Sequence, residues 1–299
     1  MPTGPADEAT AADDAVARWT PPGLPPGRAV ELPGRGTTWV HEAPGPPGAP
    51  TVVLLHGWMA TGALNWFPSF ESLATRARVV SIDHRGHGRG IRTGERFRLA
   101  DCADDAVALL DVLGVERAVL AGYSMGGPIA QLGWHRHRHR VAGLVLCATS
   151  ATFRQSPAEH AMFAGLGGVA AALRLTPQRW RRSGFARAFV GRFDDSELGR
   201  WAAREVRGHD RRMVVEAGQA IGRFRSTQWI GEVDVPTAVV LTRQDRLVPP
   251  ARQSRTARAI PGATIHDVDG DHVVCSTAPE RFVPVLAAAV DDVVGRAAR

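Results

Sequence analysis

Residues 118–127 read AVLAGYSMGG, and this short stretch decides the fold. An apolar run typical of a buried strand passes directly into the G-x-S-x-G pattern around Ser124, and the residues that follow favour a helix. Gly122 and Gly126 are needed because the strand-to-helix turn is so tight that a Cβ atom at either position would meet neighbouring backbone. Such a turn places the Ser124 hydroxyl at the carboxyl end of a sheet. A plain glycine-rich connection is the alternative that the pattern leaves open.

Strand and helix patterns alternate on both sides of this stretch. Strands are predicted at residues 37–42, 51–55, 78–82, 118–121, 141–147, 237–241 and 263–268. Helices are predicted at residues 67–75, 99–113, 251–260 and 279–296, with one more running from the G-x-S-x-G turn to about residue 137. This alternation predicts an α/β protein with a mostly parallel central sheet and helices on both faces.

The alternation stops in the middle of the chain. Residues 150–230 have helical patterns without a clear strand, which predicts an inserted helical cap, with the core at residues 29–149 and 231–299. Residues 1–28 are rich in Ala, Pro, Asp and Gly, which favours a flexible tail. The cap also carries the basic excess of the chain, whose net charge is +6. This charge fits a solvated surface, and attraction of anionic substrates or membrane surfaces is the functional alternative.

Composition excludes several classes of protein. With 299 residues and 44% hydrophobic residues, the chain can bury a full core and is neither disordered nor a fibrous repeat. No apolar run reaches the about 20 residues of a membrane span, so no stable membrane insertion is expected. Scattered arginines and only 6% aromatic residues argue against a nucleic-acid partner. No cofactor or metal fingerprint is present. The oligomeric state cannot be read from these features.

Cysteine usage and the first residues indicate the compartment. Cys102, Cys147 and Cys275 are too few and too scattered for a disulfide framework, which fits a reducing environment. Residues 1–16 lack the basic and apolar regions of a secretory signal. We therefore expect a cytoplasmic protein.

Ser124 needs a general base, since a serine hydroxyl is a poor nucleophile at neutral pH. His272 follows the last predicted strand and precedes the last helix, the place where such a base is expected; a surface-loop histidine is the alternative. Asp245 follows the predicted strand at 237–241 and is the predicted partner that orients the imidazole. Its alternative role is a helix or turn cap. The rival position for this acid, directly after the predicted strand at 141–147, holds Ala148, Thr149 and Ser150, which supply no carboxylate, so Asp245 is favoured.

Acyl transfer also needs donors for a developing oxyanion. His56-Gly57-Trp58 follows the predicted strand at 51–55, and backbone N–H groups there can point at the same space as the N–H of Met125. The predicted oxyanion hole is therefore the Trp58 and Met125 backbone N–H groups. His56 is interpreted as a structural histidine. Asp267, Asp269 and Asp271 lie so close in sequence to His272 that turn formation is the expected role of all three.

The order Ser124, Asp245, His272, with His56-Gly57-Trp58 upstream and a helical insertion, resembles the α/β-hydrolase superfamily. The segment DHRGHG at residues 83–88 is similar to the D-x-R-G-H-G turn of that family. The resemblance covers residues 29–299. It implies a serine hydrolase that cleaves a carboxylic ester through an acyl-enzyme, acting on a small apolar acyl compound without a cofactor. Lactonases, C–C bond hydrolases and non-catalytic ligand-binding proteins share this fold, and these alternatives stay open.

Overall fold

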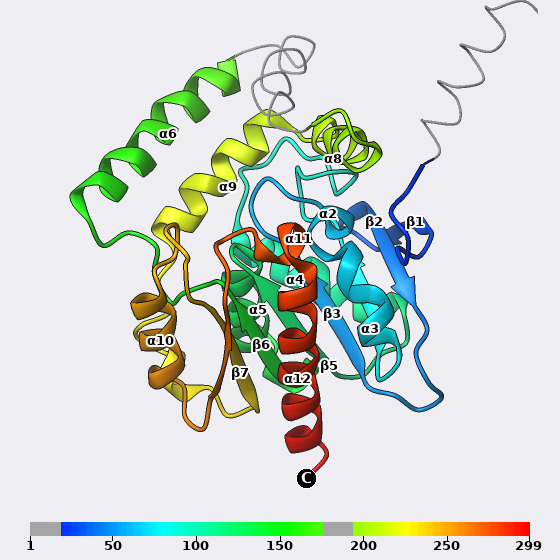
Figure 1. Ribbon diagram of the computed structural model, residues 1–299. Coiled ribbons are helices and arrows are strands. Elements are labelled where there is room, and N and C mark those ends of the chain that lie inside the picture. Colours follow the sequence, from blue (N-terminus) through cyan, green and yellow to red (C-terminus); the bar gives the residue numbers. More distant parts are fainter. Residues whose placement is uncertain (1–18, 176–193) are drawn as a thin grey trace, which may run out of the picture.

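The computed structural model describes residues 19–175 and 194–299 (Figure 1). Its strands form one eight-stranded sheet in the order β1-β2-β4-β3-β5-β6-β7-β8. β2 pairs antiparallel with β1 and β4, and every other pair is parallel, which confirms the mostly parallel sheet. The strands are β1 (Gly27–Leu32), β2 (Gly36–Ala43), β3 (Thr51–Leu55), β4 (Arg78–Ile82), β5 (Ala118–Tyr123), β6 (Val141–Cys147), β7 (Thr237–Thr242) and β8 (Thr264–Val268).

The central strands are apolar throughout because both faces of the sheet are covered. All residues of β3 and β5 are buried, as expected of parallel strands between two helical layers. One face carries α4 (Leu99–Val112), α5 (Gly126–Arg136) and α10 (Pro250–Ala259). The other face carries α3 (Phe70–Ala74) and α12 (Pro279–Ala297), with α2 (Gly62–Trp66) and α11 (Val274–Thr277) above it (Figure 1). The carboxyl ends of the parallel strands therefore meet at one edge.

The insertion between β6 and β7 is helical in its described part, which includes α6 (Pro157–Leu175), α8 (Glu197–Arg207) and α9 (Arg211–Arg223). α6 lies against α9, and both stand at the edge where β3 and β5 end (Figure 1). An isolated β-bridge between Thr152 and Arg225 brings the two ends of the insertion together. Within the described ranges, no helix combines the length and the apolar character needed to cross a membrane.

Three local features differ from the sequence-based expectation. Residues 19–28 do not form a free tail: Trp19 and Leu24 pack against the core, and β1 begins at Gly27. Residues 1–18 of the predicted tail lie outside the described residues. The sequence gives no strand signal for β1, because glycine and proline border this short segment on both sides. In place of the helix predicted at 67–75, the chain forms a 3-10 turn at Phe67–Ser69, which contains Pro68, followed by α3, because proline interrupts the helical hydrogen bonds.

Candidate active site

Ser124 lies in the tight turn between β5 and α5. Its φ is 49°, a left-handed value that is uncommon outside glycine. A Cβ atom at Gly122 would lie 2.2 Å from the Gly126 carbonyl oxygen, and one at Gly126 would lie 2.0 Å from the Leu55 carbonyl oxygen. Both glycines are thus required by close backbone approach, as the sequence predicts. The Ser124 N–H donates to the Cys147 carbonyl at 2.9 Å, which anchors the turn to the neighbouring strand.

The structure brings Ser124, His272 and Asp245 together in one hydrogen-bonded line. His272 Nε2 is 2.9 Å from Ser124 Oγ, and His272 Nδ1 is 2.7 Å from Asp245 Oδ2. A carboxylate can only accept, so Nδ1 carries the proton and Nε2 can accept from the serine hydroxyl. The loop that holds His272 is anchored to the end of β5, because Tyr123 Oη donates to the His272 carbonyl at 3.0 Å.

Asp245 is buried, and both oxygens of its carboxylate accept hydrogen bonds. Oδ1 accepts from the Leu247 and Val248 N–H groups, each at 2.8 Å, and Oδ2 accepts from the Thr242 hydroxyl at 2.9 Å as well as from His272. These bonds fix the orientation of the carboxylate. The aspartates near His272 in sequence have other partners: Asp267 pairs with Arg243, Asp269 accepts from Gln244, and Asp271 accepts from the Val273 N–H.

The predicted oxyanion donors border the serine. Gly57 and Ser124 are close neighbours, since a Cβ atom at Gly57 would lie 3.4 Å from Ser124 Cβ. The Gly57 N–H is already engaged, donating to Asn65 Oδ1 at 2.8 Å. Within residues 19–175 and 194–299, the backbone N–H groups of Trp58 and Met125 donate to no protein group. Both therefore remain available to a ligand.

The hydrogen bonds of His56 fit a structural role and not the role of a second general base. Its Nδ1 donates to the Gly57 carbonyl at 2.7 Å, and its Nε2 accepts from the His84 N–H at 2.9 Å. Burial lowers its pKa well below the usual value, so the ring is neutral. It ties the end of β3 to the turn after β4.

The DHRGHG turn at residues 83–88 is hydrogen-bonded to the start of α2. Asp83 Oδ1 accepts from the Gly62 N–H at the start of α2, and Oδ2 accepts from the Arg89 N–H, each at 2.8 Å. Burial outweighs these two bonds and raises the pKa of Asp83 to about 7. Gly86 and Gly88 have φ values of 74° and 48°, which the turn requires. The segment therefore shapes a turn after its strand.

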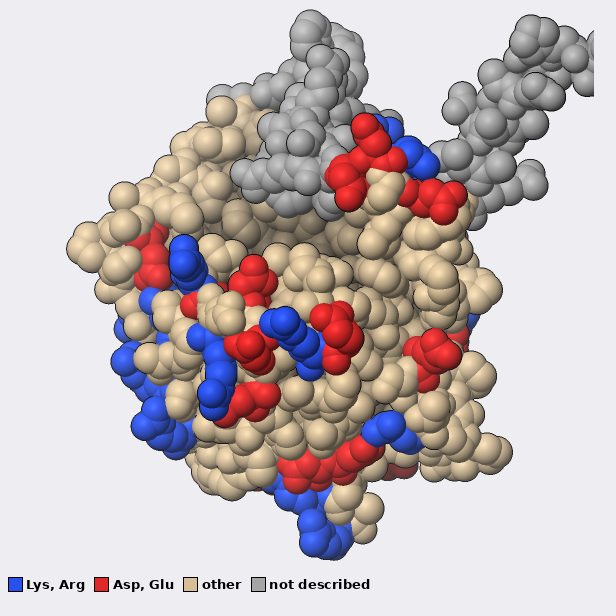
Figure 2. Space-filling view, viewed as in Figure 1, with Lys and Arg blue, Asp and Glu red and all other residues tan. Residues whose placement is uncertain are grey.

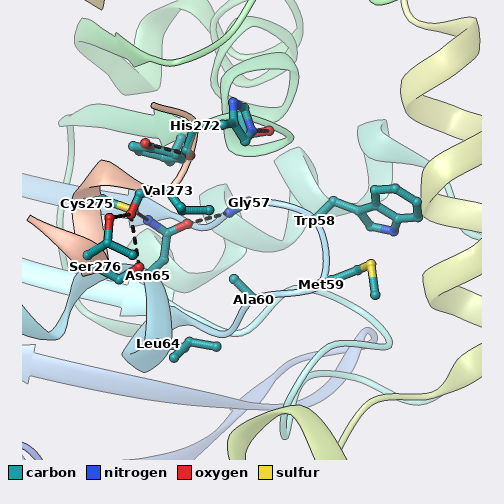
Figure 3. A pocket seen from close by; sticks show the side chains of 13 residues that line it. Gly57, Trp58, Met59, Ala60, Leu64, Asn65, His272, Val273, Cys275 and Ser276 are labelled. Carbon is teal, nitrogen blue, oxygen red and sulfur yellow. Dashed lines mark hydrogen bonds between the residues drawn. The ribbon is translucent and has the colours of Figure 1, made fainter. Parts of the chain in front are cut away.

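A pocket of about 450 Å³ opens at Ser124 and His272 (Figure 3). Its size falls in the range of roughly 300–1,000 Å³ that small-molecule sites occupy. Its described lining contains no arginine, aspartate or glutamate. It consists of Gly57, Trp58, Met59, Ala60, Leu64, Asn65, Tyr123, Ser124, His272, Val273, Cys275, Ser276 and Thr277.

Several polar groups of this lining already bond to one another or to nearby backbone. Besides its bond to Gly57, Asn65 donates through Nδ2 to Cys275 Sγ at 3.5 Å. Ser276 and Thr277 donate to the Val273 carbonyl at 3.1 and 3.0 Å. Burial raises the pKa of Cys275 to about 12, so its thiol is neutral. The sequence did not identify Asn65 as a site residue, because a single asparagine in an apolar helix carries no motif.

Among residues 19–175 and 194–299, no group of three or more His, Cys, Asp or Glu side chains is arranged to hold a metal ion.

Comparison with known proteins identifies the fold family. Residues 50–279 match the family model described as alpha/beta hydrolase fold. The chain is 30% identical over 253 residues to the putative carbamate hydrolase RutD of Caulobacter sp. (strain K31), which covers 81% of this chain and 91% of that protein. Two solved structures, each 23% identical, share the fold. The enol-lactonase from Burkholderia xenovorans LB400 has a TM-score of 0.70, covering 88% of this chain and 99% of that one. The thermophilic esterase from Thermogutta terrifontis has a TM-score of 0.71, covering 90% and 99%.

Proposed function

We propose that this chain, which belongs to the α/β-hydrolase fold family, hydrolyses a carboxylic ester or related acyl compound through an acyl-enzyme on Ser124. The observation that supports this most directly is the line of hydrogen bonds from Ser124 Oγ through His272 to Asp245, with distances of 2.9 and 2.7 Å. A serine in this setting has a base within reach, and the base is oriented by a buried carboxylate.

In the proposed mechanism, His272 Nε2 accepts the Ser124 proton while Oγ attacks the substrate carbonyl carbon. The negative charge that develops on the carbonyl oxygen is stabilised by the Trp58 and Met125 N–H groups. The tetrahedral species then breaks the bond to the leaving alcohol, which takes its proton from His272. A water molecule, deprotonated by His272, attacks the acyl-enzyme carbonyl. The bond from Ser124 Oγ to the acyl carbon then breaks, Oγ takes the proton back from His272, and the acid is released. Asp245 stabilises the imidazolium that forms in both halves.

The pocket supports a neutral, partly apolar substrate. Its carbon-rich walls include Trp58, Leu64 and Val273, and among the residues that the structure describes no arginine, aspartate or glutamate lines it. A substrate carboxylate placed there would lose its hydration without gaining a cationic partner, which is costly. The pocket therefore favours uncharged acyl groups over dicarboxylic ones.

A carbamate or a lactone is the second candidate substrate. The relative from Caulobacter is named a putative carbamate hydrolase, and one neighbour by fold is named an enol-lactonase. Both compound classes present a carbonyl with a leaving heteroatom, so the same three residues can act on them in the same order. A panel of neutral esters of increasing chain length, lactones and carbamates, assayed under the same conditions, would rank these classes.

Replacing the nucleophile tests the proposal. Ser124→Ala removes the attacking oxygen and should lower kcat by a thousand-fold or more, about the loss typical of triad variants. Wild-type protein should be labelled by a fluorophosphonate and Ser124→Ala should not. Ser254→Ala, which removes an α10 hydroxyl that bonds to Arg258, is the matched control and should keep wild-type activity.

Two results would contradict the proposal. Ser124→Ala that keeps more than about one per cent of kcat would exclude Ser124 as nucleophile. Wild-type protein that is neither labelled nor active on the panel, yet binds the same compounds, would support the non-catalytic alternative.

A further inference from the structure

The segment that carries one proposed oxyanion donor has an uncommon backbone. We call residues 56–61, between β3 and α2, the oxyanion loop. Met59 has a φ of 63°, a left-handed value that costs free energy in a residue with a side chain. Such a conformation persists only where surrounding contacts hold it. The contacts around Trp58 therefore decide whether its N–H can point steadily at the substrate.

The core holds one end of this loop. The Gly57 N–H donates to Asn65 Oδ1 at 2.8 Å, and Asn65 lies on α2 of the core. This bond fixes the His56–Gly57 peptide. The next peptide, which carries the Trp58 N–H, is held at its Gly57 carbonyl by His56 Nδ1–H at 2.7 Å. The Ala60 N–H also donates to the Gly57 carbonyl, at 3.3 Å, and closes the turn that contains Met59. The Met59 carbonyl itself has its partner in the insertion.

The insertion holds the rest of the loop through three hydrogen bonds. Trp58 Nε1 donates to the Val214 carbonyl of α9 at 2.7 Å, and the indole extends toward that helix (Figure 3). The Thr61 hydroxyl donates to Glu205 of α8 at 2.9 Å. The Met59 carbonyl is 3.0 Å from His209 Nε2, in the turn between α8 and α9. Each contact joins positions that are more than a hundred residues apart in sequence.

His209 is arranged so that only one tautomer satisfies its neighbours. The Gly88 N–H donates to His209 Nδ1 at 2.8 Å, so Nδ1 is an acceptor and Nε2 carries the proton. Nε2–H then donates to the Met59 carbonyl. Burial lowers the pKa of His209 to about 4, so the ring is neutral and keeps both bonds near neutral pH.

We infer that His209 is a positioning residue for the oxyanion hole: by holding the Met59 carbonyl it fixes the left-handed turn that follows Trp58, and so steadies the Trp58 N–H. The oxyanion loop then lies between two anchors from the core, His56 and Asn65, and one from the insertion, His209. The inserted helices thereby complete the active site as well as standing over it. The inference rests on the proposed acyl-transfer function. It assigns to His209 a role that the sequence alone does not suggest.

Two variants that differ by one methylene separate the bonds of His209. Asparagine places a carbonyl oxygen near the position of Nδ1, so His209→Asn can accept from the Gly88 N–H but cannot reach the Met59 carbonyl. Glutamine reaches the Nε2 position, so His209→Gln can accept from Gly88 and donate to Met59. Arg204→Ala is the matched control, because Arg204 joins α8 to the Trp19 carbonyl at 3.1 Å and does not touch the oxyanion loop.

The test combines steady-state kinetics on a neutral ester with amide hydrogen exchange of residues 56–61. We expect His209→Asn to lower kcat and kcat/KM together by about 10- to 100-fold with KM unchanged, because a misplaced donor weakens transition-state binding. Exchange in the oxyanion loop should become faster in this variant. His209→Gln should restore most of kcat and the slow exchange, and Arg204→Ala should match wild type in both measurements.

Other outcomes overturn the inference. Equal kcat and equal loop exchange in His209→Asn and wild type would show that His209 does not hold the loop. Equal losses in His209→Asn and His209→Gln would show that the Met59 bond is not what matters. If wild-type protein hydrolyses none of the tested compounds, the proposed function fails, and the exchange measurement alone then decides whether His209 positions the loop.

Discussion

The carboxylate of Asp245 shows how much a single residue of the site depends on its neighbours. One oxygen accepts from two backbone N–H groups, and the other faces His272 and the Thr242 hydroxyl. The backbone donors leave no freedom to rotate the group, so the oxygen that faces His272 must be an acceptor. This arrangement imposes the tautomer in which His272 Nε2 can take the Ser124 proton.

Asp245→Asn should therefore lose most of the activity while the protein stays folded. The Leu247 and Val248 N–H groups will keep the amide oxygen, so the amide nitrogen will face His272 and donate to Nδ1. The proton of His272 then moves to Nε2, which can no longer act as a base, and kcat should fall by about 10⁴-fold. Asp269→Asn and Asp271→Asn, changed as controls, should lose far less. If Asp269→Asn or Asp271→Asn lowered kcat more than Asp245→Asn, the role of orienting His272 would not belong to Asp245.

At the level of elements, the junction of β5 and α5 leaves no room for side chains at its glycines. Backbone atoms occupy the space that a Cβ atom would need. One of them is the Leu55 carbonyl oxygen of β3, which cannot rotate away as a side chain can. Any displacement of this junction would move Ser124 relative to His272, which comes from a different element.

Gly126→Ala tests this packing. The new Cβ atom would meet the Leu55 carbonyl oxygen at 2.0 Å, so the start of α5 must shift. We expect the free energy of unfolding to fall by about 1–3 kcal/mol, the usual cost of overpacking, and kcat to fall with it. Gly165→Ala in α6 is the control, because nothing lies within 4 Å of its Cβ position. It should stabilise the protein by up to about 1 kcal/mol through helix propensity, with kcat unchanged. Equal effects of the two substitutions on thermal unfolding and kcat would contradict this account.

At the scale of the whole molecule, charges are spread over the surface while several titratable groups are buried. Figure 2 shows basic and acidic side chains next to one another on the lower part of one face, and a hollow below the insertion whose floor lacks both kinds. Exposed pairs such as Arg138–Glu232 add little stability. The buried histidines matter more, because they must stay neutral. Burial lowers the pKa of His84 to about 3 and that of His209 to about 4, and also lowers the pKa of His56 and His87.

Stability should therefore fall as the pH is lowered from about 6.5 toward 4. In this window the unfolded histidines take up protons and the folded ones do not, so the unfolded state is favoured by up to about 1.4 kcal/mol per pH unit for each such group. Asp83, with a pKa raised to about 7, acts in the opposite direction as a single group. Urea unfolding at several pH values checks this. His209→Gln should reduce the pH slope by about one proton, and a free energy of unfolding that rises on acidification would contradict the assignment.

The sequence by itself determined seven of the eight strands, all except β1, together with the sharp turn at Ser124 and the order of Ser124, Asp245 and His272. These features depend on local patterns: apolar runs, glycines on both sides of the serine, and polar residues just after predicted strands. Because the carboxyl ends of parallel strands share one edge of the sheet, residues that follow these strands meet there. This rule predicts that Ser124, Asp245 and His272 lie close together.

Only the tertiary structure decided how the site is held and what it can admit. The contact between Trp58 and Val214 joins positions 156 residues apart, and that between His209 and Met59 joins positions 150 apart. Asn65 reaches Gly57 from a helix with no motif of its own, and the uncharged pocket lining is drawn from several separate segments. Periodicity and motifs report a residue's relation to its sequence neighbours. Hydrogen bonds between distant segments depend instead on how the insertion packs on the core, and no local pattern encodes that packing.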